Sequence, residues 1–268
     1  MAFVIGSKAY VGTGYTAGLA GFKDFWEYDP STDAWTQLTD FGGVERGEAA
    51  GFAVGSKGYL GTGYRDDIGI CQDFWEYDPS TDAWTQIADF GGVARTAASG
   101  FSLGGKGYVG LGTDGDEYVD FWEYDPDTDA WTQIADFGGE KRYEAIALTI
   151  GSYGYAGLGR GTLGTGLKDW WRYDPTADAW TQMADFGGSG RYGIAGFTLN
   201  GKGYIVCGYD TNELKEFWEY DPDEDSWTQL TDFASTQRAY AVGFAVGSYG
   251  YLTCGVRNST VYKDLWKW

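Results

Sequence analysis

Residues 73–87 read DFWEYDPSTDAWTQI, and this pattern returns along the whole chain. Close variants of its opening Asp-Phe-Trp triplet occur at residues 24–26, 120–122, 169–171, 216–218 and 264–266. The steps between successive triplets are 49, 47, 49, 47 and 48 residues. A constant core with small changes in spacing indicates one structural unit that is repeated and joined by loops of adjustable length.

Each unit carries four short strand signals. In the second unit they are residues 51–54, 59–63, 73–77 and 84–87, and turns rich in Gly, Pro and Asp separate them. The runs are aromatic and β-branched, and helical periodicity is missing from the sequence. Four strands in a unit of this length are typical of a propeller blade. We therefore predict one all-β domain over residues 1–268, a six-bladed β-propeller whose blades have four antiparallel strands.

The repeated pattern resembles the Kelch repeat family over the whole chain. The resemblance rests on a Gly-rich second strand followed by a spaced Tyr and Trp, here Gly58–Gly63, Tyr77 and Trp84. The usual double glycine is split, as Gly61-Thr62-Gly63, which still allows close approach between strands. The resemblance implies a Kelch-type propeller, and it does not choose among the many activities that share this fold.

All 13 tryptophans lie at repeating positions, mostly on the third and fourth strands of the units. Large aromatic rings at regular positions predict packing between adjacent blades. This accounts for every tryptophan, so none is predicted to be a ligand platform.

The last repeat is incomplete. The fourth-strand motif Trp-Thr-Gln occurs five times, whereas the third-strand triplet occurs six times. We therefore predict a last blade of three strands with an open edge at residues 264–268. Unpaired edges invite pairing with another strand, so a homodimer through this edge is one expectation. The alternative is a truncated or engineered fragment that tolerates the missing strand.

The strand order assigns the loops between second and third strands, and the links between blades, to one face, which we call the loop face. Its loops vary among repeats, and variable loops on a rigid scaffold often carry binding function. Five arginines precede the first strands at a constant offset and are predicted to ring the mouth of the central channel on this face. Arginines in such a ring could bind carboxylate or phosphate, or each could pair with a carboxylate or carbonyl of its own blade. They are Arg46, Arg95, Arg142, Arg191 and Arg238.

Tyrosines and two glutamates are predicted on the same face. A Tyr- and Arg-rich patch is typical of binding hot spots, although the loops could instead pack on themselves. Glu48 and Glu144 each follow a repeated arginine by two residues. They could act as acid and base in sugar chemistry, or they could simply pair with the arginines. The candidate tyrosines are Tyr15, Tyr64, Tyr143, Tyr192, Tyr209 and Tyr240.

Composition narrows the class of function. The net charge of −20 opposes binding to nucleic acid or anionic membranes, and no apolar run approaches the ~18 residues of a membrane span. Histidine is absent, which excludes a Ser-His-Asp triad and, with scattered cysteines, argues against zinc. We predict no metal and no cofactor, and three free thiols at Cys71, Cys207 and Cys254. The first residues lack the features of a signal peptide, and the compartment stays open.

Three functions are compatible with these observations. The first is a non-enzymatic binding scaffold whose loop face takes a protein segment or an anionic glycan. The second is a sugar epimerase or mutarotase, which the resemblance suggests because bacterial N-acetylneuraminate epimerase is a six-bladed Kelch relative. The third is a designed or recently amplified repeat scaffold with no evolved ligand.

Overall fold

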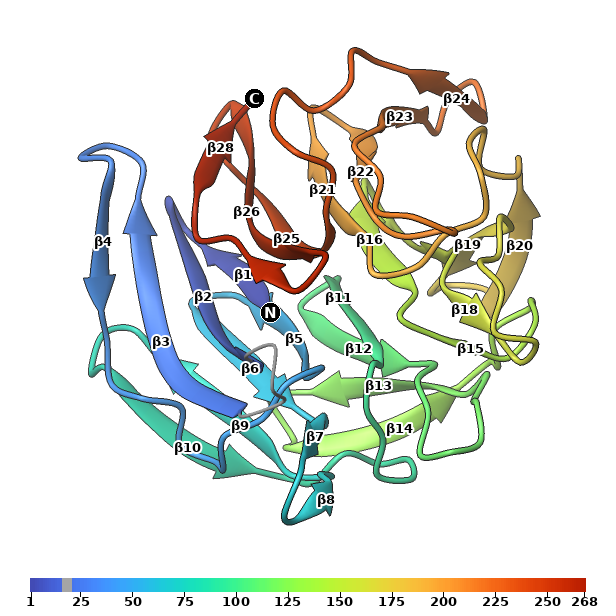
Figure 1. Cartoon of the computed structure of the whole chain (residues 1–268). Coiled ribbons are helices and arrows are strands. Elements are labelled where there is room, and N and C mark those ends of the chain that lie inside the picture. Colours follow the sequence, from blue (N-terminus) through green and yellow to red (C-terminus); the bar gives the residue numbers. More distant parts are fainter. Residues whose placement is uncertain (16–20) are drawn as a thin grey trace.

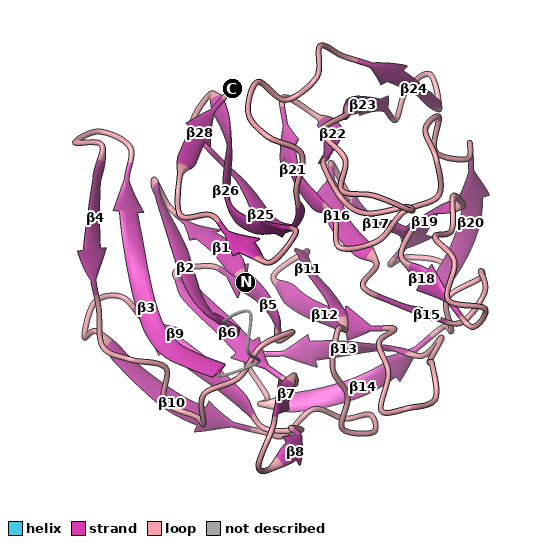
Figure 2. Cartoon of the chain, viewed as in Figure 1, coloured by secondary structure: helices cyan, strands magenta, loops and turns pink. Residues whose placement is uncertain are grey.

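The structure is a computed structural model that describes residues 1–15 and 21–268. It is a six-bladed β-propeller in which six antiparallel sheets surround a central axis (Figure 1). The described residues form strands and loops and contain no helix (Figure 2). No helix that could cross a membrane is therefore found among them. The predicted fold class is confirmed. The sequence predicts the first variable loop of the loop face over residues 15–23, and residues 16–20 of it lie outside the described part.

The blades are built from four ranks of strands. The first strands, nearest the axis, are β1 (Ala2–Ile5), β5 (Ala50–Val54), β11 (Ser99–Leu103), β16 (Ile146–Ile150), β21 (Ala195–Leu199) and β25 (Ala239–Val246). The second strands are β2 (Lys8–Tyr15), β6 (Lys57–Gly61), β12 (Lys106–Gly110), β17 (Tyr153–Gly157), β22 (Lys202–Val206) and β26 (Tyr249–Arg257). The third strands are β3 (Gly21–Asp29), β9 (Phe74–Asp78), β13 (Phe121–Asp125), β19 (Trp170–Asp174), β23 (Phe217–Asp221) and β28 (Leu265–Lys267). The fourth strands are β4 (Ala34–Gln37), β10 (Ala83–Ile87), β14 (Ala130–Ile134), β20 (Ala179–Met183) and β24 (Ser226–Gln229).

Five shorter strands lie in the loop-face connections. β7 (Tyr64–Arg65) pairs with β8 (Gly69–Ile70), and β15 (Arg142–Tyr143) pairs with β18 (Arg160–Gly161). The fifth, β27 (Thr260–Val261), belongs to the last blade.

The ring closes where β1 of the first blade contacts β25 of the last. Small residues line the axis because neighbouring first strands approach closely. A Cβ added to Gly243 would lie 2.7 Å from the carbonyl oxygen of Gly196 in the preceding blade. This packing leaves a cavity of about 230 Å³ beneath the loop face, lined by segments such as Ala49–Gly51, Ala98–Gly100 and Ala145–Ala147.

The turn between the third and fourth strands explains part of the repeat. In the second blade, an oxygen of Asp78 accepts hydrogen bonds from the amide and the hydroxyl of Ser80, at 2.8 and 2.6 Å. This is an Asx turn, in which the side chain takes the place of a backbone acceptor. Asp82 ends the turn with a φ of 49° and accepts the hydroxyl proton of Tyr77 at 2.8 Å.

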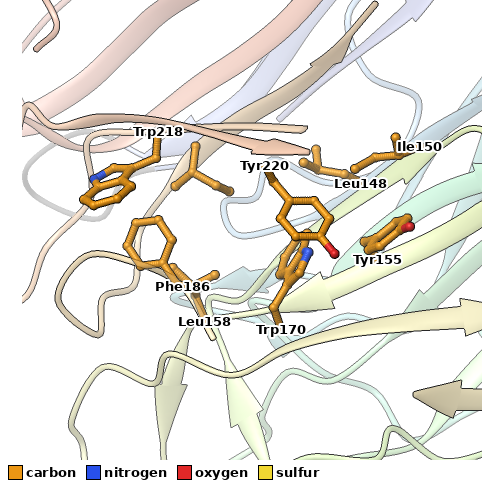
Figure 3. Packing of buried hydrophobic residues seen from close by; sticks show 9 residues of the cluster. Leu148, Ile150, Tyr155, Leu158, Trp170, Phe186, Trp218 and Tyr220 are labelled. Carbon is orange, nitrogen blue, oxygen red and sulfur yellow. The ribbon is translucent and has the colours of Figure 1, made fainter. Parts of the chain in front are cut away.

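Aromatic side chains join each blade to the next, as predicted. Trp84 of the second blade packs edge-on against Phe25 and Phe41 of the first, with both centroid distances at 5.0 Å. Figure 3 shows the same junction between the fourth and fifth blades, where Tyr220 lies near Trp170. Each such aromatic pair adds about 0.5–1.5 kcal/mol beyond the burial of its surface.

The last blade differs from the prediction of three strands, because its sheet has four. The additional strand, β27, pairs with Val256 and Arg257 at the loop-face end of β26. Beside it, β28 pairs with Tyr251–Thr253 of the same strand. The sheet therefore gains a strand through a tight return of the variable loop, which the sequence pattern did not reveal. Outward from the axis, β28 is the last rank of this blade, and its far edge has no strand partner within the described residues (Figure 1).

Candidate functional site

The five repeated arginines are buried ion-pair residues, each with 0% of its surface exposed. In the fourth blade, Arg142 donates to both carboxylate oxygens of Asp169, at 2.7 and 2.6 Å, and to the Leu158 carbonyl at 3.0 Å. Its Nε donates to the Glu140 carbonyl at 2.8 Å, and its guanidinium lies over the ring of Phe137. Equivalent pairs join Arg46 to Asp73, Arg95 to Asp120, Arg191 to Glu216 and Arg238 to Asp264.

These contacts explain why an arginine repeats at this position. The amide of Arg142 donates to Tyr118 and its carbonyl accepts from Gly112, both in the third blade. Its side chain pairs within the fourth blade, so the residue fastens two blades together. The prediction that these arginines form a ligand-binding ring is therefore replaced by a structural role in joining the blades. Their donors are used by a carboxylate and a carbonyl of their own blade, which is the alternative that the sequence left open.

The residues that surround the channel mouth lie two positions after the arginines. We call this set the mouth ring, and its members are Glu48, Ala97, Glu144, Gly193 and Tyr240. All have positive φ angles, of 53°, 53°, 52°, 59° and 56° respectively. The backbones are linked around the ring, since Ala97 donates to the carbonyl of Glu48 and Glu144 donates to the carbonyl of Ala97. Four non-glycine residues of the mouth ring thus have a left-handed backbone conformation, which such residues rarely adopt.

Glu144 and Tyr240 meet across the mouth ring. The phenolic oxygen of Tyr240 lies 3.4 Å from each carboxylate oxygen of Glu144. Gly193 stands between them in the ring, and a Cβ there would lie 3.0 Å from the ring of Tyr240. The glycine therefore makes room for the tyrosine to lean towards the glutamate. Tyr240 itself is 46% exposed, so this pair faces the open mouth.

The Glu144 carboxyl holds its proton more strongly than an exposed glutamate does. Burial raises its pKa, the negative charge of Glu48 raises it further, and Arg160 with the Tyr240 hydroxyl offset part of the shift. The resulting pKa of Glu144 is about 7. This group consequently changes charge near neutral pH, which ordinary carboxyls do not do.

Arg160 is the cation of the site, on the short strand β18. Its guanidinium lies between two aromatic rings, 5.6 Å from that of Tyr143 and 5.2 Å from that of Tyr192. Its Nε donates to the carbonyl of Gly164 at 3.2 Å. Tyr192 in turn packs against Tyr209, with centroids 5.4 Å apart. The stacked arrangement holds the cation at the flank of the mouth ring, beside Glu144.

Glu48 and Tyr15 occupy the opposite flank. A carboxylate oxygen of Glu48 accepts the hydroxyl proton of Thr96 at 2.7 Å, and the glutamate is exposed. Tyr15 lies against Gly47 and donates its hydroxyl to the carbonyl of Tyr64. Burial and the nearby Glu48 carboxylate raise the pKa of Tyr15 well above its usual range.

Most of the predicted site residues thus lie around one opening. The five arginines are buried and do not face it. Glu48, Glu144, Tyr143, Tyr192 and Tyr240 lie at or beside the mouth ring. Tyr64 contributes its backbone, and Tyr209 contributes its ring to Tyr192.

Sequence reasoning missed Arg160, Thr96 and Gly193. A signal for Arg160 exists, since it follows the Gly-X-Gly segment of its repeat at the position where other repeats carry Tyr64, Thr113 and Tyr209.

The described residues contain no group of three or more His, Cys, Asp or Glu side chains that could hold a metal ion. The three cysteines are free, as predicted. Burial raises the pKa of the Cys207 thiol to about 12, so this cysteine is not a reactive thiolate at neutral pH.

Comparisons with known proteins support the fold and leave the function open. No protein-family model and no curated protein matches the sequence. Among solved structures, the chain is similar to the one titled "Structure of YjhT", with a TM-score of 0.85 at 15% sequence identity. The match covers 98% of this chain and 92% of that one. It shows a shared six-bladed β-propeller fold.

Proposed function

We propose that this protein is a Kelch-type binding module whose channel mouth takes a polypeptide segment through a basic side chain. The observation that carries the proposal is the pair of glutamates on the mouth ring. Glu48 and Glu144 are separated there by one alanine, above a cavity lined by small residues. The scaffold around them repeats from blade to blade, whereas the mouth-ring positions carry four different residue types, with glutamate at two of the five.

Charge favours a cationic ligand over the anionic glycan considered from the sequence. The arginines that supported an anion site are buried, and the two glutamates create a negative mouth on a chain of net charge −20. A molecule with this field attracts basic segments from solution, and a cleft concentrates the effect. The exposed ring of Tyr240 at the mouth adds a favourable contact for a lysine or arginine head group.

The raised pKa of Glu144 fits the same role. Burial and Glu48 disfavour its ionised form, and a bound cation would favour that form again. Binding of a basic side chain should therefore release a proton below pH 7. The affinity should rise with pH between about 5.5 and 8 because the ionised glutamate attracts the cation.

The test uses fluorescein-labelled peptides with a single central Lys or Arg, flanked by Gly and Ala, titrated at low salt and followed by anisotropy. We expect binding that strengthens with pH. Glu48→Gln and Glu144→Gln should each weaken it about tenfold, in the range of one charged hot-spot contact. Asp116→Asn removes one exposed charge from the same face outside the mouth ring and should change the affinity less than about twofold.

A uniform effect of all three substitutions would contradict the proposal, because it would show attraction by overall charge alone. Binding of anionic sugars in preference to the basic peptides would contradict it as well.

A second candidate is acid–base chemistry on a sugar, favoured by one specific observation. A carboxyl with a pKa of about 7 that contacts a tyrosine hydroxyl is suited to proton transfer at neutral pH. The Kelch resemblance suggests an epimerase or mutarotase as the class. Proton NMR of N-acetylneuraminate anomers with catalytic amounts of protein would show faster interconversion, and Glu144→Gln would abolish it. An unchanged interconversion rate would remove this candidate and leave the peptide site untouched.

A further inference from the structure

Arg160 is an arginine of the loop face that has no carboxylate partner among the described residues. The five repeated arginines each form an ion pair within their own blade. Arg65, on the short strand β7, pairs with Glu45 at 3.0 Å and also with Asp67. The one hydrogen bond that Arg160 donates within the described part of the chain goes to a backbone carbonyl, that of Gly164.

The contacts of Arg160 repeat part of the pattern seen at the buried arginines. In Arg142, Nε donates to a backbone carbonyl, both Nη atoms donate to the carboxylate of Asp169, and an aromatic ring lies against the guanidinium. In Arg160, Nε likewise donates to the carbonyl of Gly164, and aromatic rings lie against the guanidinium. The part of the pattern that Arg160 lacks is the carboxylate.

The guanidinium of Arg160 is held in place by its surroundings. The rings of Tyr143 and Tyr192 lie 5.6 and 5.2 Å from it, and Tyr192 is itself buried and packed on Tyr209. These contacts use the faces of the guanidinium and its Nε edge. The edge formed by the two Nη atoms is the one that binds a carboxylate through two parallel hydrogen bonds.

This cation lies beside the two glutamates without being neutralised by them. Burial raises the pKa values of Glu144, Tyr192 and Tyr240, and the positive charge of Arg160 opposes each of these shifts. Arg160 is therefore close enough to the mouth ring to act on its groups, yet it makes no ion pair with Glu144 among the described residues. The opening consequently offers an acidic and a basic contact side by side.

We propose that Arg160 binds the α-carboxylate of a polypeptide whose last residue is the lysine or arginine held by Glu48 and Glu144. The inference rests on the proposed function and narrows its ligand to a chain end. A C-terminal basic residue carries both charges on one residue, so it satisfies both contacts of the opening at once. The cavity of about 230 Å³ beneath the mouth ring is closed in by the blades, and a chain end needs only one path out of it.

The proposal reverses the order of affinities that overall charge predicts. On a protein of net charge −20, a peptide amide that ends in lysine should be attracted more strongly than the free acid, because the acid adds a negative charge. If Arg160 holds the carboxylate, the free acid binds more tightly than the amide.

The test is isothermal titration calorimetry of the unaltered protein at low salt and pH 8, where Glu144 is ionised. The peptide acetyl-Gly-Ala-Gly-Ala-Lys is compared as the free acid and as the amide. We expect the free acid to bind at least about tenfold more tightly, as for one charged two-pronged contact. A third peptide, the amide of acetyl-Gly-Ala-Gly-Ala-Lys-Asp, offers its carboxylate on a side chain and should bind no better than the lysine amide.

Two arginine variants locate the contact. Arg160→Gln should weaken binding of the free acid about tenfold, to the level of the amide, and change binding of the amide less than about twofold. Arg65→Gln is the matched control, because it removes one positive charge from the same face at a residue already paired with Glu45 and Asp67. It should preserve the preference for the free acid.

The outcomes separate this inference from the function on which it rests. Equal binding of acid and amide, both weakened by Glu144→Gln, would overturn the inference and leave the proposed function standing. A lack of binding by every basic peptide would contradict both. Binding of the Lys-Asp amide as tight as that of the free acid would overturn the assignment to a chain end. A preference for the free acid that persists in Arg160→Gln would overturn the role of Arg160.

Discussion

Arg142 and Glu144 are two residues apart in one link between blades, and their side chains lie in opposite environments. The arginine is wholly buried and pairs with a carboxylate of its own blade, as its counterparts in four other blades do. The glutamate lies on the mouth ring, where the other blades carry Glu, Ala, Gly and Tyr. Both positions have a fixed backbone, so the difference lies in what surrounds the side chain.

The contrast separates scaffold from site within a single repeat. A position that contacts the next blade must satisfy the same geometry at each link, and its residue type repeats, as the arginine does at five links. A position that faces the channel mouth meets no repeated neighbour, and its residue type is free to differ. Variation between repeats therefore marks the candidate site more directly than any single motif.

The strongest test removes a buried arginine. Arg142→Ala should lower the free energy of unfolding by about 3–5 kcal/mol, because it leaves the Asp169 carboxylate and the Leu158 carbonyl without their partner. In a domain of this size that corresponds to a fall in Tm of roughly 10 °C or more. Chemical and thermal unfolding would measure it.

The matched control is Glu144→Ala in the same link. It should leave the stability unchanged or raised at neutral pH, since it removes a partly buried charge. Equal destabilisation by both substitutions would break the proposed division between scaffold and site.

The next effect concerns pH and Glu144. Its pKa is about 7 in the folded protein and near 4.5 in an unfolded chain, so between these values the folded state holds a proton that the unfolded state has released. Stability should therefore fall as pH rises from about 4.5 to 7 and level off above that range, by up to about 3 kcal/mol.

Glu144→Gln should remove this decline, so that the variant matches the parent at pH 4 and exceeds it at pH 8. Urea unfolding at several pH values would measure the difference. Parallel curves for the two proteins would show that Glu144 titrates like an exposed carboxyl. Glu48→Gln should shift the midpoint of the decline to lower pH, because it removes the neighbouring negative charge.

The sequence alone predicts the propeller because its signal is local and repeated. Three features recur at regular spacing, and each specifies one part of a blade. They are the tryptophans, the Asx turns and the Gly-rich second strands. The burial of the arginines was harder to foresee. Their partners, such as Asp73 for Arg46, lie across a variable loop, and the offset alone does not show which way a side chain turns.

The site itself was only partly predictable. Placement of Glu144 on the loop face followed from strand order, whereas its contact with Tyr240 depends on ring closure between residues 96 positions apart. The stacking of Arg160 between Tyr143 and Tyr192 joins three elements from two blades. Likewise, β27 is only two residues long, Thr260–Val261, and so short a run within a variable loop does not stand out as a strand.

The smallest expected effect compares two versions of the buried ion pair. Asp169 accepts both guanidinium prongs of Arg142, whereas Glu216 accepts one from Arg191 and leaves a 3.4 Å contact to the Cys207 carbonyl. The longer glutamate also moves the tryptophan hydrogen bond, from 2.7 Å at Trp171 to 3.1 Å at Trp218.

A two-pronged pair is stronger and better oriented than a single contact. We therefore expect Glu216→Asp to raise the free energy of unfolding by up to about 1 kcal/mol, and Asp169→Glu to lower it by a similar amount. Denaturant midpoints of the two single variants and of the double variant would measure these changes. The two effects should add, because the pairs lie in different blades and share no partner. If Glu216→Asp instead destabilises the protein, the fifth blade has adapted its backbone to the longer side chain, and the five arginine sites are less alike than their shared position implies.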